Sequence, residues 1–100
     1  MANIQRLDDL TATQTAIVTG TTTLMMAANK DRIAAIIANE SGGKFWYAWT
    51  NSAPADDTTM FPLADGTSII YGGTGDAVHT TALYVRHAQS GSKNFKAGEA

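Results

Sequence analysis

Residues 45–49 read Phe-Trp-Tyr-Ala-Trp and place four aromatic rings within five positions. Aromatic side chains favour extended backbone, and a run this short cannot form a stable independent helix, so it predicts a β-strand. Because side chains alternate across a strand, Phe45, Tyr47 and Trp49 should share one face, opposite Trp46. Both faces therefore carry large rings. One face should fill a core, and the other should either meet a second layer or lie exposed.

The rest of the chain is divided in a similar way, into short apolar or β-branched runs separated by turn-forming residues. Turn signals recur roughly every ten residues, a pattern typical of a sandwich or barrel. Asp65-Gly66 marks a tight reversal. No fixed-period repeat is visible, which argues against a solenoid. Further strands are expected over residues 21–27, 68–71, 77–79 and 82–88, with a short last one over 94–96.

Residues 30–39 allow two interpretations. Ile33, Ile36 and Ile37 fit one helical face, and the alanines among them are good helix formers. The run is short, however, and ends at an Asn-Glu-Ser-Gly-Gly turn that another β-rich run follows at once. We favour a buried strand here, with the helix as the alternative.

The N-terminal segment is polar and free of aromatic residues. Ile4, Leu7 and Leu10 are spaced three apart, which a short amphipathic helix would require. Seven threonines then fall between Thr11 and Thr23, and β-branched residues favour extended backbone. We predict an extended N-terminal arm over residues 1–20 and an all-β, antiparallel, jelly-roll-like β-sandwich domain over residues 21–100.

Composition narrows the classes of function. A chain of 100 residues is long enough for one domain. Only 16% of residues are charged and the net charge is −2, so no cationic field is available to neutralise phosphates, and we expect no nucleic-acid partner. With no cysteine there is no thiolate nucleophile and no Cys-based zinc site. The sequence lacks a signal-peptide pattern and a long apolar run, so we expect a soluble protein with no membrane contact.

No motif in the sequence indicates catalysis. Residues 72–76, Gly-Gly-Thr-Gly-Asp, lack the Gly-Lys-Ser/Thr end of a phosphate-binding loop. His79 and His87 would lie about 26 Å apart on a continuous strand, too far to share a metal ion, and we expect structural histidines. The loop carboxylates lack calcium-loop spacing. Asn39-Glu40-Ser41 matches the glycosylation pattern, a match we interpret as accidental. We therefore expect no enzyme, no cofactor and no metal.

Four segments together resemble the small structural proteins of tailed bacteriophages known as decoration, cement or head-fibre proteins. The first is an Arg-led strand that closes on Asn, residues 32–39, and the second is the aromatic strand. A Pro-Leu-x-x-Gly-x-Ser turn over residues 62–68 and a late strand over 82–86 complete the pattern. The turn carries Ala64-Asp65 where such turns often have Pro or another small residue before Gly, a minor departure.

This resemblance implies a virion protein, made in the host cytoplasm during assembly, that binds and stabilises the phage capsid. The partner would be the major capsid protein or another virion protein, and the chain would form a homo-oligomer, with a trimer favoured. A ligand that binds only the intact lattice opposes its disassembly. A tail or fibre component, or a carbohydrate-binding module that uses exposed aromatics, is the alternative. The candidate partner-binding residues are Ile4, Leu7, Leu10, Trp46 and Trp49.

Overall fold

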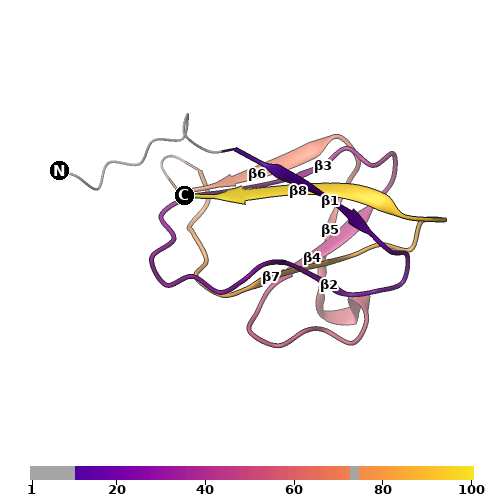
Figure 1. Cartoon of the computed structure of the whole chain (residues 1–100), viewed down its shortest axis with the longest axis horizontal. Helices are drawn as coiled ribbons and strands as arrows, with labels where there is room; N and C mark the ends of the chain where they lie inside the picture. Colours follow the sequence, from indigo (N-terminus) through magenta and orange to yellow (C-terminus); the bar gives the residue numbers. More distant parts are fainter. Residues whose placement is uncertain (1–10, 73–74) are drawn as a thin grey trace.

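The computed structural model describes residues 11–72 and 75–100, and these form two four-stranded antiparallel sheets (Figure 1). The first sheet has the order β1-β8-β3-β6, and the second has the order β2-β7-β4-β5. The all-β antiparallel sandwich predicted from the sequence is confirmed, while the jelly-roll-like refinement stays a prediction. The strands are β1 (Thr13–Ile17), β2 (Thr23–Met26), β3 (Ala35–Asn39), β4 (Phe45–Trp49), β5 (Phe61–Leu63), β6 (Thr67–Tyr71), β7 (Leu83–Arg86) and β8 (Lys93–Glu99), with a short 3-10 helix, η2 (Asp57–Thr59).

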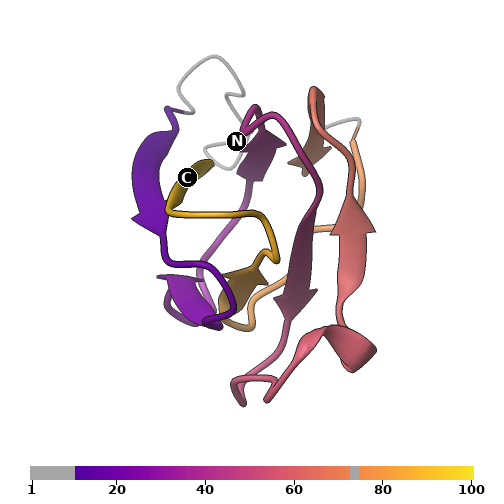
Figure 2. The same cartoon turned by 90° about the vertical axis from the view of Figure 1, so that its right-hand side faces the viewer.

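The edge strands of the two sheets meet in pairs on opposite sides of the molecule. Residues 18–22 join β1 to β2, and residues 64–66 join β5 to β6, so each short link holds one edge of each sheet together. Figure 2 shows β1 and β2 at one side and β5 and β6 at the other. The second link contains the predicted reversal, in which Gly66 has φ of 80°, a conformation that favours glycine. This turn connects the two sheets instead of forming a hairpin within one.

The core lies between the sheets and is filled by alternate residues of both. Phe45 of β4 and Phe95 of β8 are fully buried, with ring centroids 4.8 Å apart. Ile37 on β3 and Val85 on β7 are also fully buried. Each buried side chain of this size stabilises the fold by roughly 1.5–3 kcal/mol relative to exposure. As predicted, Tyr47 and Trp49 pack against the same core as Phe45.

The first strand corrects the predicted arm over residues 1–20. β1 pairs with β8 through five residues, and its last side chain, Ile17, is fully buried. The extended conformation that the threonines favour is therefore used inside the chain's own sandwich, and the domain begins before residue 21. Ile4, Leu7 and Leu10 lie outside the described residues.

Three further segments test the strand predictions. β3 is a strand in which Ala35, Ile37 and Asn39 are buried in alternation, so the favoured strand interpretation is confirmed for residues 35–39. Residues 30–34 form a turn and irregular backbone before it, and no helix is present in this segment. The last strand is wrong in extent, because β8 runs over seven residues and pairs with both β1 and β3 at the centre of its sheet. Residues 77–79 form no strand; Val78 packs against the core, and Ala77 and His79 line a groove.

Candidate functional site: an aromatic groove and its buried polar support

A groove of about 360 Å³ lies against the β5/β6 side of the sandwich. Three strands and the segment after β6 contribute to it, and rings dominate its surface. Its lining consists of Tyr47 and Trp49 from β4, Phe61 from β5, Tyr71 from β6, and Asp76, Ala77 and His79 from the following segment. Residues that are distant in the sequence meet here because β4 and β5 belong to one sheet and β6 to the other.

The rings of the groove have defined mutual orientations. The imidazole of His79 stacks on Trp49, with centroids 5.2 Å apart and planes 9° apart. Tyr71 meets Trp49 edge-on at 80°, and Trp49 Nε1 donates a hydrogen bond of 3.0 Å to the Tyr71 hydroxyl. Offset stacking and edge contacts of this kind are favourable aromatic geometries. Trp49, Tyr71 and His79 therefore form one interlocked wall.

Phe61 forms a more open part of the lining. Its side chain is 63% exposed, the largest exposure among the large hydrophobic residues that the structure describes. It lies directly opposite Tyr47 in the β4–β5 register, and the two rings are 6.0 Å apart with planes tilted by 39°. A ring this exposed still has apolar area to cover, so this pair offers a surface for a ligand.

Tyr71 remains protonated across the physiological range. Burial raises the pKa of its hydroxyl to about 12, against the opposing effect of the hydrogen bond from Trp49. The neighbouring Tyr47 and the carboxylate of Asp76 raise this pKa further. The groove thus presents the exposed carboxylate of Asp76 beside a neutral, buried phenol, and the carboxylate can hydrogen-bond to a polar ligand.

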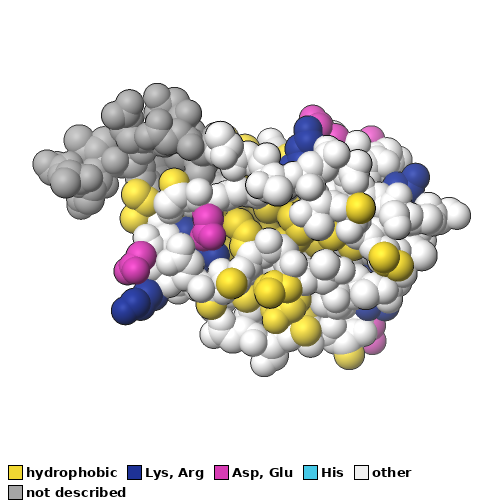
Figure 3. Space-filling view, viewed as in Figure 1, with side chains coloured by type: hydrophobic (Ala, Val, Ile, Leu, Met, Phe, Trp, Pro, Cys, Tyr) yellow, Lys and Arg dark blue, Asp and Glu magenta, His cyan; other side chains and the backbone are white. Residues whose placement is uncertain are grey.

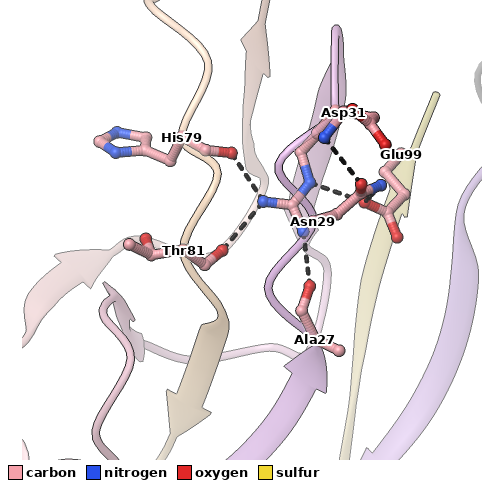
Figure 4. A network of polar contacts seen from close by, with 7 residues as sticks. Ala27, Asn29, Asp31, His79, Thr81 and Glu99 are labelled. Atoms are coloured by element: carbon pink, nitrogen blue, oxygen red, sulfur yellow. Dashed lines mark hydrogen bonds and ion pairs between the residues drawn. The ribbon is translucent and has the colours of Figure 1, made fainter.

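Arg32 supports this wall from inside the fold, and Figure 4 draws the carbonyl groups of Ala27, His79 and Thr81 that its guanidinium binds. Arg32 is only 3% exposed, and its guanidinium carbon lies 5.2 Å from the centroid of the Trp49 ring. Nη1 donates to the carbonyl oxygens of His79 at 2.6 Å and Thr81 at 2.9 Å, and Nη2 donates to that of Ala27 at 2.8 Å. One buried side chain therefore fixes the backbone that carries His79 against Trp49.

Asn39 has the same kind of role at the other end of β3. It is fully buried, and Nδ2 donates to the carbonyl oxygens of Gly43 and Leu63, each at 2.8 Å. Its Oδ1 accepts from the Ser41 backbone N–H at 3.0 Å. Both amide hydrogens are used and the side chain is inaccessible, which agrees with our interpretation of the glycosylation match as accidental.

The two histidines occupy different environments. His87 is 1% exposed, its Nδ1 accepts from the Gln89 backbone N–H at 3.1 Å, and its Nε2 lies 2.7 Å from the Ile17 carbonyl oxygen. Because Nδ1 accepts, the hydrogen must reside on Nε2, which donates to Ile17. His87 thus joins β1 to the end of β7, whereas His79 is exposed at the groove.

The structure separates the two tryptophans that the sequence proposed as partner-binding residues. Trp49 lines the groove, while Trp46 is half-buried on the opposite face, where Lys44 Nζ lies 5.0 Å from its ring centroid. Sequence reasoning did not identify Phe61, Tyr71 or His79 as neighbours of Trp49. Pro62 follows Phe61 in the sequence, and proline within a strand indicates an edge strand. No local sequence feature, however, indicates that β6 belongs to the other sheet.

The fold and the groove define a small antiparallel β-sandwich with an aromatic groove on one side. Comparisons with known protein families, curated proteins and solved structures gave no match for this chain. Within residues 11–72 and 75–100, no helix is long and apolar enough to span a membrane. The same part of the chain contains no group of three His, Asp or Glu side chains placed to hold a metal ion.

Proposed function

We propose that this chain is a non-enzymatic structural protein of a tailed-phage virion, which binds and stabilises the assembled capsid. The observation that carries the proposal is an apolar band along the β1/β2 side of the sandwich. Val18, which follows β1, is 57% exposed, and Leu24 on β2 is 50% exposed. Figure 3 shows hydrophobic side chains gathered between these two edge strands.

Such a band suits a protein that functions with this side covered. Contiguous exposed apolar surface commonly marks an interaction site. β1 and β2 are also edge strands, whose outer backbone groups can pair with another chain. A virion protein or a second copy of this chain, seated along the β1/β2 side, would cover both the side chains and the strand edges.

The resemblance to decoration proteins gains support from what its segments do in the fold. Arg32 and Asn39, the first and last residues of the Arg-led segment 32–39, are buried and hydrogen-bonded, and the turn at Gly66 joins the two sheets. In both sheets, strands from the first and second halves of the chain alternate. Alternation of this kind supports a jelly-roll-like connection pattern, which is common in capsid domains.

The proposed mechanism is binding without chemistry. The chain would associate as a homo-oligomer, with a trimer favoured, and would bridge neighbouring copies of the major capsid protein. Because it would bind the assembled lattice and not free subunits, it would shift the equilibrium against disassembly.

Co-sedimentation with empty capsids of the encoding phage tests the proposal. The wild-type chain should sediment with the capsids, and Leu24→Lys should reduce the bound fraction at least about tenfold, because a charge would be buried in the interface. Ile70→Lys is the matched control, since Ile70 is 42% exposed on β6 at the opposite side. An equal loss of capsid binding in both variants, or no sedimentation of the wild type with capsids, would contradict the proposal.

A deletion of residues 2–10 tests the N-terminal route of attachment separately. It removes Ile4, Leu7 and Leu10 and leaves β1 intact. If these residues bind the partner, the deletion should lower capsid binding while the far-ultraviolet circular dichroism spectrum stays unchanged. Unchanged binding would assign attachment to the β1/β2 side alone.

A further inference from the structure

We infer that the aromatic groove binds one or two sugar rings of a glycan and does not cleave them. This activity goes beyond capsid attachment and uses the opposite side of the sandwich. A sugar ring has an apolar face of C–H groups and a rim of hydroxyl groups. A matching site needs an exposed aromatic face next to polar groups held in fixed positions.

Phe61 and Tyr47 supply the aromatic surface. Phe61 is 63% exposed, although it packs at 6.0 Å from Tyr47. Covering this ring with the C–H face of a sugar would remove apolar area from water without ordering a flexible side chain, because an aromatic ring has only two side-chain torsions. The pairing of β4 with β5 holds the two rings side by side.

Asp76 and His79 supply exposed polar groups on the same groove. A carboxylate can accept hydrogen bonds from two adjacent hydroxyl groups, and such charge-assisted bonds are strong. The backbone of Asp76 is tied to Ile70 and Gly72 by hydrogen bonds of 3.0 and 2.7 Å. His79 is held by its stack on Trp49 and by Arg32, so little ordering would be needed on binding.

The dimensions and charges of the groove favour a neutral sugar over other small ligands. A volume of about 360 Å³ lies near the lower end of the range for small-molecule sites, roughly 300–1,000 Å³. Rings beside a carboxylate can also bind organic cations. Here the buried guanidinium of Arg32 already lies 5.2 Å from the Trp49 centroid, and its positive charge disfavours a second cation.

The described lining contains a single carboxylate, that of Asp76. Hydrolysis of a glycosidic bond ordinarily requires two carboxyl groups that flank the bond, one as an acid and one as a base or nucleophile. The groove has the parts for recognition and lacks this pair, so the bound glycan should leave unchanged.

Trp49 fluorescence provides a direct test. In a Trp46→Phe background, Trp49 is the only tryptophan, and it lies in the groove. Maltose, cellobiose, lactose and N,N′-diacetylchitobiose are titrated separately to about 10 mM, with choline chloride as the cationic comparison. At least one disaccharide should give a saturable change, and choline should give none. No saturation with any of the four sugars, or saturation with choline alone, would overturn the inference.

Matched variants then localise the binding. Phe61→Ala and Asp76→Asn should each raise the dissociation constant about tenfold or more, because they remove the aromatic surface and the charged acceptor. Leu24→Ala removes an exposed apolar side chain on the β1/β2 side and should leave sugar binding unchanged. Equal weakening in all three would overturn the assignment. Capsid sedimentation of the same variants is an independent readout, so the two proposals can fail separately.

Discussion

Arg32 Nε donates to Glu99 Oε1 across 2.7 Å and so joins the turn before β3 to the end of β8. The Arg32 side chain is fully buried, whereas that of Glu99 is 35% exposed. The remaining guanidinium nitrogens bind backbone carbonyls, including that of His79. The position of the groove wall therefore depends on an ion pair between residues that are 67 positions apart in the chain.

Replacing Arg32 with methionine should destabilise the fold by about 3–5 kcal/mol, because it removes a partly buried ion pair and leaves three carbonyl oxygens without their donor. Urea denaturation measures the change. Lys96→Met is the control, since Lys96 Nζ binds Glu40 at the same distance, 2.7 Å, but both side chains are exposed to solvent. That variant should lose less than about 1 kcal/mol. A similar decrease in the free energy of unfolding in the two variants would contradict the claim that Arg32 stabilises the fold through its buried contacts.

Asn39→Asp should lower the free energy of unfolding by about 2–4 kcal/mol at neutral pH. The substitution replaces the Nδ2 donor with a buried carboxylate oxygen that faces the carbonyls of Gly43 and Leu63. Thermal unfolding monitored by circular dichroism gives the shift in Tm. Asn94→Asp makes the same chemical change at an exposed position of β8 and should leave Tm nearly unchanged.

The free energy of unfolding should fall at high pH because of the buried hydroxyl of Tyr71. Its pKa is raised from 10.0 to about 12 in the folded state, so between these values the unfolded chain binds fewer protons than the folded chain. The stabilisation is complete below about pH 10 and is lost as the pH rises towards about 12. Urea denaturation across this range should detect the loss. Tyr71→Phe should remove this component, and phenolate absorbance compared with that variant should place the titration.

Gly98→Ala should be strongly destabilising for a steric reason. A Cβ at this position, near the end of β8, would lie 1.8 Å from the backbone oxygen of Thr11, just before β1. Gly43→Ala is the matched control, because its Cβ would meet only the side chain of Gln89, which can rotate away. Chemical denaturation should show a clearly larger loss for Gly98→Ala, and equal losses would contradict this account.

The sequence by itself determined the fold class and the positions of most strands. Aromatic and β-branched runs with period two, bounded by turn residues, specify extended backbone locally, which is why residues 45–49 form β4 as predicted. The segment before the turn at Gly42 was correctly favoured as a strand because its run was too short for a helix. These are short-range effects, and they can be recognised in a window of a few residues.

Only the tertiary structure decided which strands are neighbours and which side chains meet. β8 occupies the centre of its sheet, and β1 belongs to the sandwich and not to an arm, because pairing partners are chosen over long separations in the chain. For the same reason Tyr71 and His79 pack against Trp49, while Trp46, three residues away in the chain, lies on the opposite face. Strand alternation separates near neighbours, and the stacking of two sheets brings distant residues together.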